Sequence, residues 1–124
     1  MKTLLLISAF VIFATGIAHS YLGERFILIR LFKRGDLPHL FGSPEFTTRT
    51  LRFAWHLTTV AWWGFAVQLY LLAEGAVSSR TIAATVAATS LLSALVAFIG
   101  ARGRHPAWLV FLGVGIVALY ATAI

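Results

Sequence analysis

The chain has 124 residues, of which 60% are hydrophobic and 11% are charged, and its formal net charge is +6. Soluble domains carry about 25% charged residues, so this composition indicates a membrane protein, and the length indicates a single domain. The absence of cysteine excludes disulfides, thiolate metal sites and thiol redox chemistry. Membrane proteins collect Lys and Arg in their loops, so the positive charge is not interpreted as nucleic-acid binding.

Four apolar segments predict an all-α fold, a four-helix transmembrane bundle. We expect spans at residues 3–22, 51–73, 81–101 and 106–124. Each segment is near the ~20 residues that a helix needs to cross the hydrocarbon core, where backbone groups must be paired within the segment. The first helix is expected to continue beyond the membrane to residue 32, and the second to begin near residue 44. Together these two helices are predicted to form a long hairpin on the cytoplasmic side.

The first twenty residues also resemble a cleavable signal peptide. Lys2 precedes an apolar run, and the small residues Ala18 and Ser20 stand where a cleavage site is expected. The apolar character runs on through residues 26–32, which a signal peptide does not need. We therefore interpret the segment as a retained span.

The basic residues predict the orientation of the chain in the bilayer. Eight of them lie in the first and third loops, and two lie at the opposite end. Because Lys and Arg are enriched in cytoplasmic loops, we expect both termini outside the cytoplasm, with the protein in the bacterial inner membrane. The eight are Arg25, Arg30, Lys33, Arg34, Arg49, Arg52, Arg102 and Arg104, and the two are Lys2 and Arg80.

The predicted hairpin brings polar residues of the first two spans to the same depth. If it folds symmetrically about its loop, Glu24 falls near Arg52, and His19 and His56 lie at similar depth beside Thr59. We expect His19 to face His56. On the second span, one helical face is shared by Arg49, Arg52, His56, Thr59 and Trp63.

Histidines at one depth favour a metal site. We expect a transition metal (Zn, Cu or Fe) to be bound by His19 and His56, with His105 and Glu24 as further ligands. Thr59, Arg52 and Trp63 are expected to complete the polar site. Haem b with His19 and His56 as axial ligands is less favoured, because ligands on adjacent helices do not readily face each other across a porphyrin.

Three other interpretations stay open. Intramembrane histidines also mark proton or ion paths, and a chain this short needs a homo-oligomer to form a pore. Small apolar proteins also act as accessory or assembly subunits of larger membrane complexes. Alternatively, His19 only hydrogen-bonds Thr59 or a backbone carbonyl, and Glu24 and Arg52 form a plain interfacial ion pair. An enzyme is disfavoured, since no nucleophile triad, phosphate loop or zinc-hydrolase spacing is present.

Two runs of the chain are similar to those of small four-span bacterial membrane proteins of unassigned function. They are His19-Ser20-x-Leu22-Gly23-Glu24-Arg25 and Arg52-x-Ala54-Trp55-His56-Leu57-Thr58. The resemblance covers most of the chain and implies no activity.

Overall fold

The computed structural model describes residues 1–124, and its regular secondary structure is entirely helical, which confirms the all-α prediction. The first long helix is α1 (Lys2–Leu22), which continues through a π-helical segment, η1 (Gly23–Leu28), into α2 (Ile29–Phe32). After a loop come α3 (Glu45–Ala73), α4 (Ser79–Ala101) and α5 (Ala107–Tyr120).

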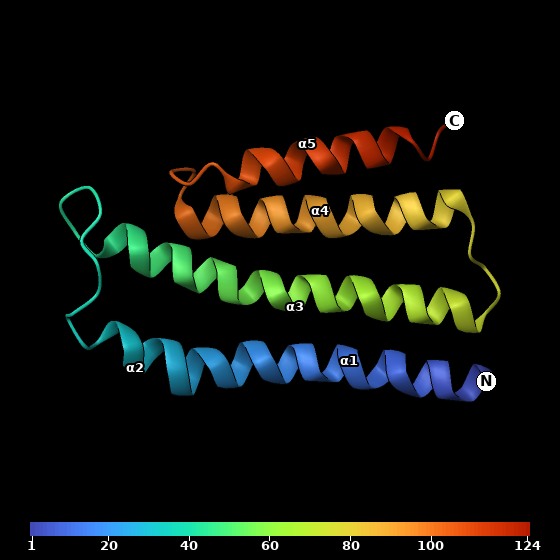
Figure 1. Ribbon diagram of the computed structural model, residues 1–124, viewed down its shortest axis with the longest axis horizontal. Coiled ribbons are helices and arrows are strands. Elements are labelled where there is room, and N and C mark those ends of the chain that lie inside the picture. The colour runs from blue at the N-terminus through green and yellow to red at the C-terminus, as the bar shows by residue number, and fades with distance from the viewer.

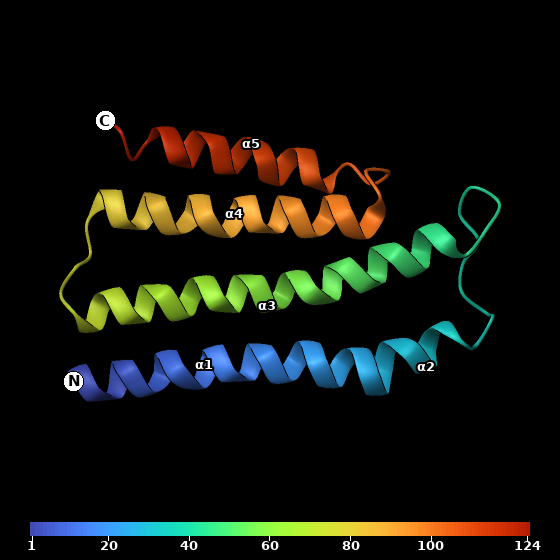
Figure 2. The same cartoon turned by 180° about the vertical axis from the view of Figure 1, so that it is seen from behind.

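The long helices lie side by side in chain order, as a single row that both views show (Figure 1; Figure 2). The first helix packs on α3, α3 packs on α4, and α4 packs on α5. Neighbouring helices run in opposite directions, so the two termini lie at one end of the row, and the loop before α3 lies at the other (Figure 1). The arrangement is thus an open row, whereas the sequence predicted a bundle.

Small residues form the contacts between the helices. Only 15 of the 124 residues are buried, and the central cluster consists of Phe53, Ala97 and Ala101. An added Cβ at Gly100 would lie 2.6 Å from Phe53 Cβ, and one at Gly115 would lie 2.6 Å from Leu91 Cδ2. Small side chains let helix backbones approach closely, which is how helices associate when lipid offers no hydrophobic driving force.

Large apolar side chains cover both open faces of the row. Exposed examples from every long helix are Leu4, Phe10, Phe65, Leu95, Ile99, Val110 and Val117. Two helices, Lys2–Phe32 and Ser79–Ala101, are long and apolar enough to cross a membrane, judged by length and composition. By comparison, α3 carries more polar residues, and α5 has only 14 residues.

The connection between α4 and α5 places basic residues at the loop end of the row. Arg102 has a φ of 50°, and Gly103 has a φ of 72°. A left-handed residue directly after the last helical turn is a common way to end a helix. The chain therefore reverses sharply at Arg102 and returns as α5.

Candidate functional site

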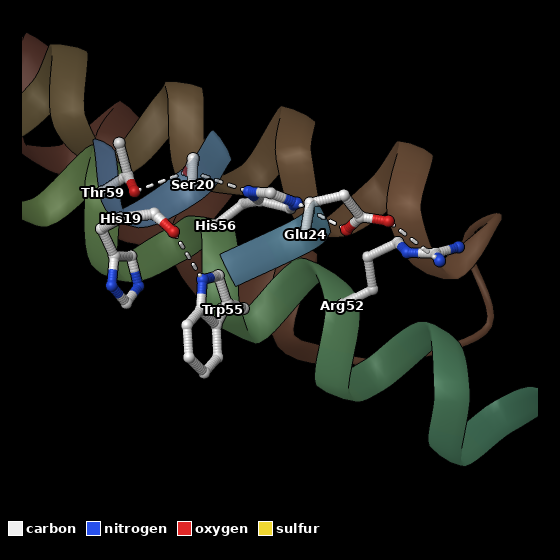
Figure 3. A network of polar contacts seen from close by, with 7 residues as sticks. All are labelled: His19, Ser20, Glu24, Arg52, Trp55, His56 and Thr59. Carbon is white, nitrogen blue, oxygen red and sulfur yellow. Dashed lines mark hydrogen bonds and ion pairs between the residues drawn. The ribbon is translucent and has the colours of Figure 1, made fainter. Parts of the chain in front are cut away.

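A chain of polar side chains lies between the first helix and α3 (Figure 3). Ser20 and Glu24 are contributed by α1 and η1, and Arg52, His56 and Thr59 by α3. Residues 16, 20 and 24 are four apart, as are residues 52 and 56, so each set lies on one helical face. The antiparallel packing of α1 against α3 brings these two faces together.

The contacts run in sequence from the loop end of the row toward its middle. Arg52 Nη2 lies 3.0 Å from Glu24 Oε1, and His56 Nε2 lies 3.4 Å from Glu24 Oε2. His56 Nδ1 lies 2.9 Å from Ser20 Oγ, which in turn lies 2.7 Å from Thr59 Oγ1. Thr59 Oγ1 donates to the Gly16 carbonyl at 3.1 Å.

Burial increases along this chain of contacts. The side chain of Arg52 is 46% exposed, and its guanidinium lies over the Phe32 ring. Glu24 and His56 are 30% and 31% exposed, whereas Thr59 is only 3% exposed. The Arg52 end of this chain of contacts is therefore its more exposed end.

Glu24 stands in the π-helical segment η1 rather than in regular α-helix. Such turns are rare inside helices and are frequent at functional sites. The segment contacts α3, with Gly23 against the Trp55 indole, and both Gly23 and Leu28 are buried. The wider turn thus presents Glu24 to His56 and Arg52 where the helix packs closely on α3.

His19 takes part in a separate aromatic contact. Its ring stacks on Trp55 with centroids 4.5 Å apart and planes 2° from parallel, and it tilts against Trp62 at 4.9 Å. Trp55 Nε1 donates to the His19 carbonyl at 3.1 Å. His56 instead contacts Ser20 and Glu24, and the His19 ring points away from it in Figure 3. The expectation that the two imidazoles face each other is therefore wrong.

His105 supports the start of α5. Its Nδ1 accepts from the backbone N–H of Ala107 at 3.1 Å, and its ring packs against Phe46 and Phe53. Of the four predicted metal ligands, only Glu24 and His56 contact each other. The structure contains no group of three or more His, Asp or Glu side chains that could hold a metal ion. Transition-metal binding stays a prediction, which metal analysis of the purified protein tests.

The other predicted site residues divide into two groups. The expected contact between Glu24 and Arg52 is present, and Thr59 belongs to the same chain of contacts. Trp63 lies about one helical turn after Thr59 on α3, where its Nε1 donates to the Phe13 carbonyl at 3.3 Å. Ser20, which links His56 to Thr59, was missed. Its position four residues before Glu24 is the signal that would have placed it on the site-facing side.

Counting protons shows what the site requires. The Gly16 carbonyl can only accept a hydrogen bond, so Thr59 donates its single hydroxyl proton to that carbonyl. The short Ser20–Thr59 contact then uses the Ser20 proton, and His56 Nδ1 must carry the proton that it donates to Ser20. Nδ1 is thus a donor.

The remaining contact, between His56 Nε2 and Glu24 Oε2, needs one proton more. Glu24 Oε2 is buried and has no hydrogen-bond partner, and His56 Nε2 is the ring nitrogen beside it. Without a proton, two lone pairs would face each other, which leaves a buried acceptor unpaired and costs about 1–3 kcal/mol. The geometry is completed by imidazolium facing carboxylate, or by a protonated Glu24 facing neutral imidazole.

Comparisons with known proteins add no relative to this description. No family model matches the chain, and no curated protein or solved structure matches it.

Proposed function

We propose that the chain is a multi-pass protein of the bacterial inner membrane, and that each of the four long helices in its row crosses the bilayer. Two of its helices are long and apolar enough to cross by themselves, and both faces of the row carry exposed apolar side chains. The polar side chains of Arg52, His56 and Thr59 on α3 contact the first helix, so they face protein more than lipid. The excess of basic residues at the loop end favours a cytoplasmic position for that end.

Within this protein, we propose that the Glu24–His56 pair binds and releases one proton. The observation that carries the proposal is the proton count. Four contacts connect Glu24 Oε2 to the Gly16 carbonyl, and an ionised carboxylate, a neutral imidazole and two hydroxyls supply only three protons. The fourth proton, shared by Glu24 and His56, completes the chain. Its release must break one of the four contacts.

Loss of the proton would therefore act on the packing of α1 against α3. The contacts join residues of the two helices, so breaking one loosens the hairpin at the level of η1. Imidazole is the side chain whose charge changes most readily in the physiological pH range. We infer that the site responds to protons and that its response is a change in the packing of α1 on α3.

The experiment is ¹⁵N NMR of the histidine rings in lipid nanodiscs over a range of pH. As the pH is lowered, we expect the His56 ring to gain its second proton and the Ser20 and Thr59 resonances to change at the same time. The matched control is the exposed loop residue His39, whose titration should leave these resonances unchanged. A His56 ring that titrates with no response from Ser20 or Thr59 would overturn the proposal.

A second candidate function is that of a subunit in an assembly, either a homo-oligomer or a larger membrane complex. The open row favours it, because α1 packs mainly on α3 and α5 mainly on α4, which leaves their outer sides uncovered. Proton conduction also requires an assembly, since the chain of polar contacts ends at Gly16. Light scattering and native mass spectrometry of the purified protein would give its copy number. A strict monomer that co-purifies with no other subunit contradicts this second function.

A further inference from the structure

A pocket of about 550 Å³ lies where the first turns of α3 meet the end of α4. Three arginines line it: Arg49 and Arg52 from α3, and Arg102 directly after α4. Ser43 and Thr48 add hydroxyl groups, and Ile99 gives the pocket an apolar edge. Arginines that are far apart in sequence thus converge on one cavity, where the chain turns from α4 toward α5.

The charges around this pocket do not balance. Its single acidic residue, Glu45, forms an ion pair with Arg49 at 2.6 Å. Arg52 shares its guanidinium with Glu24, which lies in the proton site. The other acidic residues, Asp36 and Glu74, pair with Arg34 and Lys2. Arg102 therefore forms no ion pair, and the pocket keeps an excess of positive charge.

The backbone adds to this positive field. The 29-residue helix α3 begins at the pocket, and of its first N–H groups only that of Glu45 meets a side chain, Ser43 Oγ at 3.4 Å. The first N–H groups of a helix are unpaired within it and carry the positive end of the helix dipole, which favours anions. The guanidinium groups carry the larger charge, and their planar forks match the oxygens of a phosphate group.

We propose that this pocket binds a phosphate group, supplied by the headgroup of an anionic phospholipid or by free phosphate. Basic pockets between helices on the cytoplasmic side are suited to lipid headgroups. The lipid source rests on the membrane placement proposed above, whereas binding of free phosphate does not. Arg25, Arg30 and Arg104 lie at the same end of the row but do not line the pocket, so the proposal concerns a built site and not the general positive charge.

The experiment measures binding to the purified full-length protein in detergent. Dioleoyl-phosphatidylglycerol, dioleoyl-phosphatidylcholine and inorganic phosphate are each titrated while thermal unfolding is followed, and native mass spectrometry counts the retained lipids. The variants are R102Q, which removes the unpaired charge, and R102K, which keeps the charge but loses the fork. The control is R80Q at the opposite end of α4, where the arginine is also exposed. Circular dichroism verifies that each variant is folded.

Phosphatidylglycerol is expected to stabilise the wild type more than phosphatidylcholine does. R102Q should weaken this binding roughly tenfold, because one charge-assisted contact is lost. R102K should retain part of the affinity, and R80Q should remain within about twofold of wild type, since a distant surface charge acts weakly. Protection by inorganic phosphate that R102Q abolishes would identify free phosphate as the source, and protection by the lipid alone would identify the headgroup.

The proposal is overturned if neither phosphate nor phosphatidylglycerol distinguishes R102Q from wild type. It is equally overturned if R80Q loses as much binding as R102Q, or if phosphatidylcholine protects as well as phosphatidylglycerol. None of these variants changes the Glu24–His56 pair, so the ¹⁵N spectrum of His56 tests the proton site separately. The two proposals can therefore fail independently.

Discussion

His56 Nε2 lies 3.4 Å from Glu24 Oε2, an oxygen that is buried and has no hydrogen-bond partner. Two consequences can be measured, one through the carboxylate and one through the hydroxyl on the other side of the ring. Both follow from the same requirement for a shared proton.

Replacing Glu24 by Gln should remove the second proton from His56. The neutral amide offers no charge to an imidazolium and leaves Arg52 without its partner. We expect the His56 ring to become neutral in the ¹⁵N spectrum, and the free energy of unfolding to fall by about 1 kcal/mol, since the pair is partly exposed. Glu74→Gln is the control, because Glu74 pairs with Lys2 at the other end of the row. A His56 spectrum that is the same in both variants would exclude the imidazolium form and leave a protonated Glu24 as the only form that satisfies the proton count.

Replacing Ser20 by Ala should separate His56 from Thr59. The hydroxyl links the two side chains at 2.9 Å and 2.7 Å, and no other side chain reaches both. Loss of this link leaves a ring nitrogen unpaired, so we expect a loss of about 1–3 kcal/mol in the free energy of unfolding. The measurement is unfolding by SDS titration in mixed micelles. Ser8→Ala, at an exposed position whose hydroxyl makes no hydrogen bond, should stay within about 0.5 kcal/mol of wild type.

Replacing Gly23 by Ala tests the close approach at the start of η1. An added Cβ would overlap the indole of Trp55. The ring must move, which breaks its hydrogen bond to the His19 carbonyl and its stacking on His19. The backbone at Gly23 is right-handed helical, so helix propensity alone favours Ala by about 0.5–1 kcal/mol. We nevertheless expect destabilisation and a shift in tryptophan fluorescence.

The matched control for this change is Gly113→Ala on α5. An added Cβ at Gly113 meets no atom within 4 Å. This variant should be neutral or more stable, as propensity predicts. Equal behaviour of the two alanine variants would mean that Trp55 does not hold η1 against α3.

Replacing Ala97 by Leu tests the contact between α3 and α4. Ala97 is 0% exposed and packs in the cluster with Phe53 and Ala101. Extra methylene groups in such a position typically cost about 1–3 kcal/mol. We expect that loss in SDS unfolding, while Ala54→Leu at an exposed position of α3 should have little effect. An Ala97→Leu protein as stable as wild type would argue against the packing of α3 on α4 described above.

The sequence predicted the contact between Glu24 and Arg52 because the loop position sets the register of an antiparallel hairpin. It did not predict which neighbour of His56 comes from the first helix. Adjacent residues of an α-helix differ by 100° in direction, since there are 3.6 residues per turn. An error of one position therefore exchanges Ser20 for His19. Nothing in the run Gly23–Leu28 indicated a π-helical turn, which depends on how the helix packs on α3.

The open row was also beyond the reach of periodicity. Helix packing is predicted when one face of a helix differs in polarity from the others, and neither α4 nor α5 has such a distinct face. Their small residues indicate where helices approach, but not how many neighbours each helix has. Gly115 lies against Leu91 and Gly100 against Phe53, contacts that a closed bundle or an open row can both provide.

Because the main packing contacts of the row join helices that are neighbours in the chain, the fold can be assembled in the order in which it is synthesised. The contacts between α1 and α3 can form before α4 emerges, and α4 then finds its docking face on α3 already in place. Local contacts of this kind lower the entropic cost of closing loops and make folding fast. The order of the helices along the row thus also gives an order of folding, one helix at a time.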